Sequence, residues 1–365
     1  MKIVIIGAGV AGLGIGWRLA QAGAEVTVLE RSQPASGATW ASAGMIAATA
    51  ELGEAEGDEL IFAGYSNDLW RSFAAELEQA CGGSIGYSES GALMLAQDPS
   101  ALAALEDRAG PDLKLLNATE ARAIAPMLTG EFAGAIWAEH EAQVDNRALG
   151  EALAVAFRRA GGTLKTNEAV VRIERRGQKA IVAHTPFGLY HADAFVLAAG
   201  AWSGVLEPDL APITPVKGEM IALASPIEAT PPRPCIWAEG VYAVPRGRLL
   251  LLGATVEEAG FDSGLTQQAS ALLRAKAEAV MPGLKTWRQV DHWAGLRPRS
   301  PDGLPLLGPT SVEGLFVASG QYRNGILFAP AIARMMADLV LGKGAVIPAF
   351  DPRRFELARV SAGSG

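Results

Sequence analysis

The sequence is poor in cysteine and in positive charge. It holds two cysteines, Cys81 and Cys235, which are too few for a disulfide framework, and the absence of a CxxC pair argues against a structural metal site. Its 39 acidic residues outnumber its 31 basic residues, so the formal net charge is −8. Because no Lys/Arg-rich run offsets this acidity, we expect no nucleic-acid partner.

Long hydrophobic runs are absent as well. No stretch of about 18 apolar residues is free of charged and turn residues, so we expect no membrane span. The first apolar run, Lys2–Ile6, is too short for a signal peptide and ends at glycines. These absences favour a cytoplasmic protein. With 365 residues, half of them hydrophobic, the chain is long enough for about two domains.

Glycine, in contrast, is abundant. The chain has 42 glycines among 365 residues, about 12% of the chain, compared with an average glycine usage of roughly 7%. They show no G-X-Y period, which excludes collagen, and they cluster beside apolar runs. Such clusters indicate tight strand-to-helix turns and close approach of the backbone to a ligand.

The first glycine cluster lies in a predicted strand–helix–strand unit. The spacing predicts a buried strand over Lys2–Ile6, a helix over Val10–Ala22 and a second strand over Glu25–Leu29, which Glu30 follows. Between the first strand and the helix stands the GxGxxG run Gly7-Ala8-Gly9-Val10-Ala11-Gly12. This arrangement is the dinucleotide-binding pattern.

Each part of this motif has a physical reason. Gly7 permits the tight turn, Gly9 lets the backbone approach a pyrophosphate, and Gly12 lets the helix pack closely on the strand. The helix N-terminus offers N–H groups to the phosphates, and Glu30 can accept hydrogen bonds from ribose hydroxyls. A glycine-rich turn without a ligand is the alternative, and the strand–helix–strand context disfavours it. The motif does not distinguish NAD from FAD.

A run of small residues follows, and it carries a resemblance. After Glu30-Arg31 comes Ser36-Gly37-Ala38-Thr39-Trp40-Ala41-Ser42-Ala43-Gly44-Met45-Ile46, which can lie flat against an extended cofactor. This segment resembles the flavoprotein amino-acid and amine oxidases, the group of D-amino acid oxidase, sarcosine oxidase and glycine oxidase, with glycine oxidase the most similar. The resemblance covers nearly the whole chain and implies that FAD is the cofactor. No cysteine lies near 295–325, where sarcosine-oxidase relatives tether the flavin, so we expect non-covalent FAD.

The resemblance also implies the fold class: α/β, α+β overall, with a Rossmann-type FAD-binding domain interleaved with an antiparallel-sheet substrate domain, as in the glutathione-reductase-like folds of D-amino acid oxidase type. We assign residues 1–50, 145–212 and 295–350 to the FAD-binding domain. Residues 51–144 and 213–294 form the substrate domain, and 351–365 a C-terminal tail whose end, Ser361–Gly365, we expect to be disordered. Thr119 is a plausible cap of a helix that starts beside it.

The residues that we expect at the cofactor come from the glycine motif, the ribose-binding strand end, the small-residue run and three later segments. They are Gly7, Ala8, Gly9, Val10, Ala11, Gly12, Glu30, Arg31, Thr39, Ala43, Gly44, Met45, Val171, Ala199, Gly200, Trp202, Arg323, Asn324, Gly325, Ile326 and Leu327. In the family a valine backbone pairs with the adenine; Val171 is the candidate, and Val170 is the next choice. The three residues from Gly325 precede a predicted helix, where N–H groups could meet a flavin carbonyl.

Two arginines, Arg297 and Arg323, stand in Gly/Pro/apolar surroundings and could bind a substrate carboxylate with a guanidinium fork. For both arginines the alternative is a structural salt bridge with a nearby acid, such as Asp302. The resemblance implies that Arg297 and Tyr242 bind the carboxylate and that Arg323 lines the same site near the flavin. Gln321 departs from the pattern, because glycine oxidases usually have His there.

The resemblance implies FAD-dependent oxidative deamination of glycine, sarcosine or small D-amino acids. Hydride would pass from the substrate Cα to flavin N5, giving an imine and then a 2-oxoacid, with O2 as acceptor and H2O2 as product. A D-amino acid or secondary-amine dehydrogenase that reduces a quinone remains the alternative. Such an enzyme could supply thiazole formation in thiamine biosynthesis, and a homo-oligomer is a further family expectation.

Overall fold

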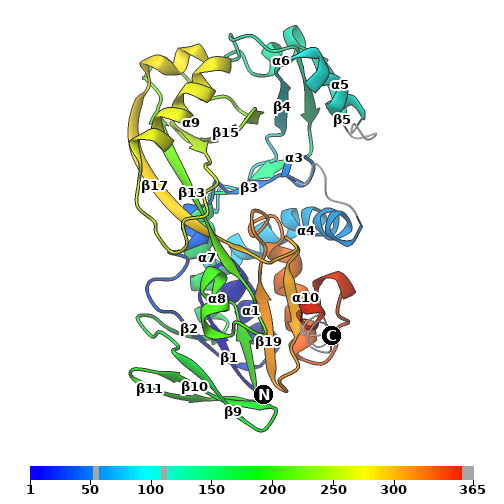
Figure 1. The fold of residues 1–365 in the computed structure, drawn as a ribbon, viewed down its shortest axis with the longest axis vertical. Coiled ribbons are helices and arrows are strands. Elements are labelled where there is room, and N and C mark those ends of the chain that lie inside the picture. The colour runs from blue at the N-terminus through cyan, green and yellow to red at the C-terminus, as the bar shows by residue number, and fades with distance from the viewer. Residues whose placement is uncertain (52–56, 108–112, 356–365) are drawn as a thin grey trace, which may run out of the picture.

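The computed structural model describes residues 1–51, 57–107 and 113–355 (Figure 1). One of its two large sheets has six strands in the order β18-β19-β12-β1-β2-β8. Their bounds are β1 (Lys2–Ile6), β2 (Glu25–Leu29), β8 (Thr163–Lys165), β12 (Ala194–Leu197), β18 (Leu306–Pro309) and β19 (Leu315–Ser319). All neighbouring pairs are parallel except β18 with β19. The predicted strand–helix–strand unit at the N-terminus is therefore confirmed.

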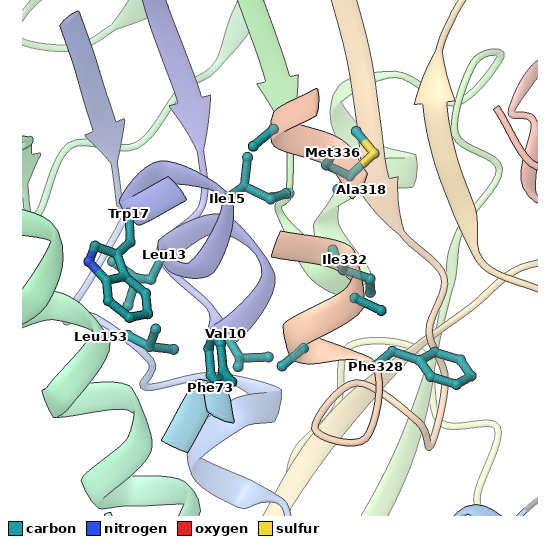
Figure 2. Close-up of a cluster of buried hydrophobic side chains, with 14 of the residues drawn as sticks. Val10, Leu13, Ile15, Trp17, Phe73, Leu153, Ala318, Phe328, Ile332 and Met336 are labelled. Atoms are coloured by element: carbon teal, nitrogen blue, oxygen red, sulfur yellow. The ribbon is translucent and has the colours of Figure 1, made fainter. Parts of the chain in front are cut away.

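Helices cover one face of this sheet. α1 (Val10–Gln21) packs between α7 (Asn146–Arg159) and α10 (Ala329–Val340), and their buried side chains form one apolar core (Figure 2). Asp145 begins α7 because its Oδ1 accepts hydrogen bonds from the N–H groups of Arg147 and Ala148. α1 and α10 approach closely at Gly14, where an added Cβ would lie 3.1 Å from the Cβ of Ala333. The small residue thus sets the distance between the two helices.

A three-stranded antiparallel sheet covers the other face. It consists of β9 (Arg172–Arg176), β10 (Lys179–Thr185) and β11 (Gly188–His191). Ile173 and Ala183 pack there against Phe195 and Leu197 of β12. The six-stranded sheet is therefore buried on both faces, which explains why its strands are almost uniformly apolar.

The second large sheet has eight strands in the order β17-β13-β16-β15-β14-β4-β6-β5. Their bounds are β4 (Ala92–Ala96), β5 (Leu113–Asn117), β6 (Gly134–Ala138), β13 (Thr214–Ala224), β14 (Cys235–Ala238), β15 (Val241–Arg246), β16 (Leu249–Gly253) and β17 (Arg288–Arg299). α9 (Gln267–Val280) packs on it with Leu273 and Ala277 buried. The long strands β13 and β17 run from this sheet toward the six-stranded one (Figure 1). The mixed architecture confirms the predicted fold class.

Two short helices, α5 (Pro99–Asp107) and α6 (Ala118–Ile124), lie at the far edge of the second sheet. The expectation that Thr119 caps the second of these helices is wrong. Asn117 is the cap: its side chain accepts from the N–H groups of Thr119 and Glu120, and the Glu120 carboxylate accepts from the N–H of Asn117. This reciprocal pair is a capping box, which satisfies more backbone donors than a single hydroxyl does.

The remaining elements join the two sheets. They are α2 (Ala38–Ala41), β3 (Met45–Ile46), α3 (Ala48–Glu51), α4 (Asp58–Cys81), β7 (Ala142–Gln143), α8 (Ser203–Leu206) and the 3-10 turns η1 (Gly200–Trp202), η2 (Pro282–Thr286) and η3 (Pro348–Phe350). α4 lies within 51–144, the range that we assigned to the substrate domain. Its side chains Trp70 and Phe73 are nevertheless buried in the same core as α1 and α10. In the described ranges no helix is long and apolar enough to cross a membrane. Ser361–Gly365 lie outside the described residues.

Candidate active site

A cavity of about 550 Å³ lies where the two large sheets meet. Its floor is formed at the carboxyl ends of β1, β2, β12 and β19, and residues of β13, β15 and β17 line the opposite end. The chain order reverses between β1 and β12, and such switch points are where open α/β sheets bind ligands. The volume is in the range of cofactor and substrate sites.

The glycine motif forms one wall of this cavity. Gly7 has φ +105°, and a Cβ there would lie 2.9 Å from the carbonyl carbon of Ala198, so only glycine fits the turn. Gly9 precedes α1 and carries no side chain that could block its first turn. The N–H of Val10 donates to Thr39 Oγ1 over 3.0 Å, which ties the helix start to the small-residue run. The helix N-terminus thus faces the cavity with its amides, as a phosphate site requires.

Glu30 stands at the end of β2 and lines the same cavity. Its Oε2 accepts from the N–H of Ala8 over 2.8 Å, and its Oε1 accepts from the N–H of Ser32 over 2.9 Å. Oε1 also accepts from the hydroxyl of Ser32 over 3.2 Å. A carboxylate oxygen has two lone pairs, so Oε2 keeps acceptor capacity for a ribose hydroxyl. The bond to Ala8 also fixes the carboxylate relative to the glycine turn.

Further observations fit an extended dinucleotide in this cavity. Gly44 has φ +80°, and with Ala43 and Met45 it lines the wall beyond the glycine motif. Gln321 lines the cavity and is 6% exposed, yet its Nε2 donor has no hydrogen-bond partner among the described residues. A buried donor without a partner is costly, so a polar atom of a bound group would satisfy it. The Arg31 guanidinium lies 3.3 Å over the ring of Trp202 at the same rim.

The structure bears on the choice between two valines. Val170 and Val171 both line the cavity. The N–H of Val171 already donates to the carbonyl of His184 over 2.9 Å, and its side chain is 62% exposed. This amide is therefore committed to pairing with β10, which favours the Val170 backbone as the group left for a ligand.

Most of the predicted cofactor residues line the cavity. Four do not: Ala8, Gly12, Asn324 and Leu327 lie behind its wall. A Cβ on Gly12 would collide with the Gly7 backbone, so its role is close packing of α1. The Leu327 carbonyl accepts from Ser66 Oγ and Trp70 Nε1 and so ties this turn to α4.

Asn324 donates through Nδ2 to Glu59 Oε1 over 3.3 Å. Burial raises the pKa of this Glu59 carboxyl, although the bond from Asn324 opposes the rise. Both residues support the turn that carries Arg323 rather than the cavity surface itself.

Arg297 lies at the opposite end of the cavity, on β17, and is half-buried. Its Nη1 donates to the backbone carbonyls of Lys217 over 3.3 Å and Thr255 over 3.1 Å. The alternative salt bridge with Asp302 is wrong, because Asp302 pairs with Arg354 through contacts of 2.8 and 3.0 Å. Among the described residues Arg297 has no carboxylate partner, so its charge faces the cavity uncompensated.

Tyr242 and two glycines complete this end. Tyr242 on β15 is buried, and its hydroxyl lies 3.7 Å from Met220 Sδ. Its ring rests on Gly253, where a Cβ would lie 2.7 Å from the ring. The guanidinium of Arg297 likewise rests on Gly218, where a Cβ would lie 2.5 Å from Cζ. The two candidate carboxylate-binding side chains thus each lie over a glycine.

Sequence reasoning missed Gly218 and Met220 as lining residues. These two residues lie two positions apart on β13, so both face the cavity. In the register with β17, Gly218 pairs with Gly295 and Met220 pairs with Trp293. The glycines Gly218 and Gly295, which face each other across the two strands, were the available signal. Arg323 was expected here and lies on the exposed turn after β19, where it lines the same cavity.

The cavity contains no histidine in the part of the chain that the structure describes. His292, which is near Arg297 in sequence, has its Nε2 2.8 Å from the buried Glu219 Oε2 on the outer side of the sheet. The only carboxylate lining the cavity within these residues is Glu30, at the glycine-motif end. The arrangement can therefore bind and orient an anion beside a dinucleotide, but it offers no acid–base pair at the Arg297 end.

Comparison with known proteins agrees with this geometry. The profile of the family described as DAO, FAD dependent oxidoreductase, matches residues 2–339. Glycine oxidase of Pseudomonas aeruginosa is 34% identical over 354 residues, which is 95% of this chain and 96% of that protein. The bifunctional protein ThiO/ThiG of Nostoc sp. is 34% identical over 93% of this chain and 52% of its own length. The crystal structure of glycine oxidase from Geobacillus kaustophilus superposes with a TM-score of 0.91, at 32% identity over 97% and 99% of the two chains.

Proposed function

This chain belongs to the DAO family of FAD-dependent oxidoreductases, and on that premise we propose that it oxidises small amino acids that carry a free carboxylate. Glycine, sarcosine and small D-amino acids are the candidate substrates. The product would be an imine that water hydrolyses to a 2-oxoacid. A role of this product in thiamine biosynthesis stays a prediction from the sequence resemblance.

FAD would be held non-covalently by residues that line the cavity. The amides at the start of α1 would bind the pyrophosphate, Glu30 the ribose, and the backbone at Val170 the adenine. Gln321 and the turn at Gly325 and Ile326 lie at the other end of the cofactor path. The bound cofactor supplies the two-electron acceptor that no side chain can provide.

The protein's own part in the reaction is orientation. The Arg297 guanidinium would bind the substrate carboxylate, and the buried Tyr242 hydroxyl would add a hydrogen bond. Arg323 lies at the same rim and would add positive charge. With the carboxylate fixed, the Cα of a small substrate is held in one position, which is worth several kcal/mol of barrier in oriented reactions.

The lining of this end explains why little acid–base machinery is required. In the described residues no histidine lines the cavity, and its one carboxylate, Glu30, belongs to the ribose end. A substrate that enters with a neutral amine needs no proton removed by the protein before the Cα–H bond breaks. The absence of a base beside Arg297 therefore agrees with hydride transfer rather than with proton abstraction at Cα.

One observation carries the proposal: a half-buried arginine without a carboxylate partner among the described residues lies in the same cavity as a dinucleotide-binding turn. The test is a substrate screen with the FAD-loaded protein. Glycine, sarcosine and D-alanine should reduce the flavin absorbance. Arg297→Ala should raise the KM about 30- to 1,000-fold, which corresponds to roughly 2–4 kcal/mol of lost ion-pair binding, while FAD stays bound. Arg299→Ala is the matched control, because Arg299 stands on the same strand and pairs with Glu258.

The acceptor is decided in the same assay. We propose O2, so that oxygen consumption and H2O2 release should match substrate oxidation. Reduction of the bound flavin without peroxide would instead support the dehydrogenase alternative, with a quinone as acceptor. An unchanged KM in Arg297→Ala would remove Arg297 from the site and end the proposal.

A further inference from the structure

The guanidinium of Arg297 is held by two carbonyls that come from separate segments. One belongs to Lys217, within β13, and the other to Thr255, in the chain that follows β16. The position of Arg297 therefore depends on how firmly these segments are joined. A shift of the second segment would remove one of the two acceptors.

Backbone hydrogen bonds join β13 to the segment after β16 at two neighbouring residue pairs. The N–H of Lys217 donates to the carbonyl of Glu257 over 2.9 Å, and the N–H of Glu257 donates back to the carbonyl of Lys217 over 3.0 Å. The N–H of Thr255 donates to the carbonyl of Glu219 over 3.2 Å. Beyond Glu257 the chain runs as an exposed loop to Thr266. The junction is therefore a short ladder at the edge of a loop.

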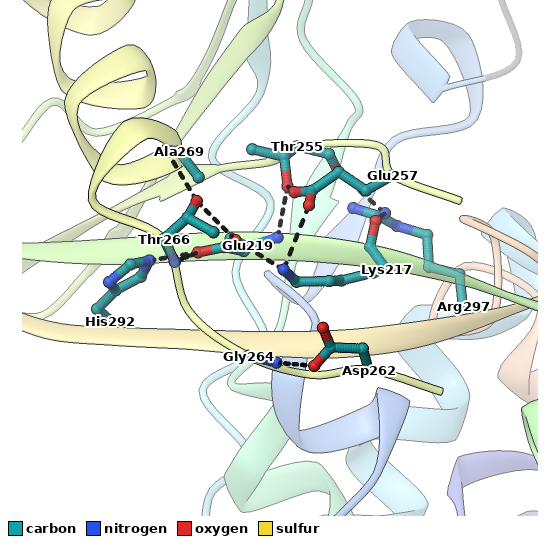
Figure 3. A network of polar contacts seen from close by, with 10 residues as sticks. All are labelled: Lys217, Glu219, Thr255, Glu257, Asp262, Gly264, Thr266, Ala269, His292 and Arg297. Carbon is teal, nitrogen blue, oxygen red and sulfur yellow. Dashed lines mark hydrogen bonds and ion pairs between the residues drawn. The ribbon is translucent and has the colours of Figure 1, made fainter. Parts of the chain in front are cut away.

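A cluster of charged side chains lies over this junction, and we name Lys217, Glu219 and Glu257 the ion triad (Figure 3). Lys217 Nζ lies 2.9 Å from Glu219 Oε1 and 3.2 Å from Glu257 Oε2. The side chains of Lys217 and Glu219 are 3% and 0% exposed, whereas Glu257 is 35% exposed. One ammonium thus joins a carboxylate of β13 to a carboxylate of the loop segment.

Thr255 connects the ion triad to the carbonyl that holds Arg297. Its Oγ1 donates to Glu257 Oε1 over 2.6 Å and accepts from the N–H of Glu219 over 2.9 Å. The side chain of Thr255 is therefore bonded to β13 and to the loop segment, while its carbonyl accepts from Arg297 Nη1. Glu257 thus accepts a hydrogen bond from Thr255 and forms an ion pair with Lys217.

The ion triad lies on the face of the sheet that points away from the cavity. Gly218 and Met220 line the cavity, and side chains alternate along a strand, so Lys217 and Glu219 point to the opposite face. The triad cannot touch a substrate at Arg297. Any effect that it has on the substrate must pass through the backbone carbonyls.

Lys217 and Glu219 stay charged around neutral pH. Hydrogen bonding to Glu219 raises the pKa of Lys217 above its ordinary value. Burial alone would raise the pKa of Glu219, but the N–H of Thr266 and the Lys217 ammonium outweigh it and the pKa is lowered. Glu219 also accepts from the hydroxyl of Thr266, which begins α9. Glu219 therefore has a structural task besides the junction, whereas Glu257 serves the junction.

We propose that the ion triad positions Arg297 for the substrate carboxylate by holding the segment at Thr255 against β13. This inference rests on the proposed function, because it takes Arg297 as the group that binds the carboxylate. When the Glu257 charge is removed, the ammonium of Lys217 holds the loop segment less firmly and the Thr255 carbonyl recedes. Arg297 then keeps one acceptor, and its guanidinium samples positions that do not suit a bidentate contact.

The test compares Glu257→Gln with Glu258→Gln in the FAD-loaded protein. Both changes replace a carboxylate by an amide of the same shape, and Glu258 points outward to Arg299 with 75% of its side chain exposed. Acetate serves as a probe of the carboxylate site alone, measured by its effect on flavin absorbance. We expect Glu257→Gln to raise the acetate Kd and the KM for glycine about three- to tenfold, with kcat within about twofold. Glu258→Gln should behave as wild type.

A stability measurement and an arginine variant separate the outcomes. Equal acetate affinity in the two glutamine variants, with Arg297→Ala impaired, would overturn the positioning role and leave the proposed function standing. Unchanged acetate binding in Arg297→Ala would instead overturn the proposed function. A lower unfolding temperature for Glu257→Gln, with kcat and KM both damaged, would show a merely structural role. Lys217→Arg, which keeps the charge, should retain more of the acetate affinity than Lys217→Met.

Discussion

Replacing Gly218 by alanine should damage substrate binding without damaging the fold. A Cβ built on Gly218 would lie 2.5 Å from Arg297 Cζ and closer still to both terminal nitrogens. Ordinary contacts between such atoms are about 3.5–4.0 Å, so the guanidinium would have to retreat by about 1 Å. The colliding atoms are the far end of a flexible side chain, whereas the strand backbone need not move.

The size of the effect follows from this displacement. A misplacement of about 1 Å at a positioning group costs about 10²-fold in rate, which equals about 2.7 kcal/mol of transition-state stabilisation. A retreating guanidinium also leaves the carbonyls of Lys217 and Thr255. In contrast, Gly→Ala in a strand by itself favours folding by roughly 0.5–1 kcal/mol. We therefore expect kcat/KM for glycine to fall about a hundredfold while the unfolding temperature changes little.

The assay is steady-state kinetics of the FAD-loaded variant together with a thermal melt. Gly188→Ala is the matched control, since Gly188 lies in a strand and an added Cβ there meets nothing within 4 Å. Full kcat/KM in Gly218→Ala would refute the placement of Arg297 at the carboxylate. A large loss of stability in Gly218→Ala alone would show that the strand, and not the guanidinium, gives way.

Three further predictions concern other parts of the chain. Glu30→Ala should weaken FAD binding by about 1.5–3 kcal/mol in a fluorescence titration of the apoprotein, because hydrogen bonds to a charged group are lost; full affinity would exclude Glu30 from the ribose site. Burial raises the pKa of Cys235 to about 12, so iodoacetamide at pH 8 should leave it unmodified in peptide mass spectra of the native protein, and labelling without unfolding would contradict this. Burial would raise the pKa of Asp302, but the hydrogen bonds and charge of Arg354 outweigh burial and lower this pKa below 3.8. The ionised carboxylate therefore stabilises the folded protein above pH 3.8, and this contribution is lost as the pH falls below that value. Asp302→Asn should accordingly melt at a lower temperature than wild type at pH 7, and the difference should shrink below pH 3.8; a constant difference would contradict the pairing.

Local patterns in the sequence were sufficient for the cofactor end. The unit from Lys2 to Glu30 is continuous in the chain, and its strands and helix have local sequence patterns. Gly7 has a positive φ, and Gly9 before α1 has no side chain that could cap the helix; both follow from residue types that the sequence shows directly. At α6 the local pattern was not sufficient, because the cap is Asn117 rather than Thr119.

The substrate end required the tertiary structure. The sequence identified Arg297 as a charged residue in apolar surroundings but left open whether Asp302 neutralises it. The answer depends on Arg354, near the C-terminus, which forms an ion pair with Asp302. The glycine beneath the guanidinium comes from another strand, and the carbonyl of Thr255 comes from a loop. No pattern in sequence reveals such contacts, because each joins residues that are far apart along the chain.

The sequence, with the family resemblance that it carries, therefore predicted the fold class, the dinucleotide turn and the residue types of a candidate carboxylate site. Turns, caps and strand–helix alternation depend on short-range sterics and hydrogen bonds, which local sequence specifies. Only the tertiary structure decided three features. Arg297 is without a carboxylate partner among the described residues, Gly218 and Gly253 clear space for the two candidate carboxylate-binding side chains, and an ion triad lies on the other face of the sheet. These depend on strand register and on the meeting of distant segments, and one step in register would turn every one of these side chains to the other face.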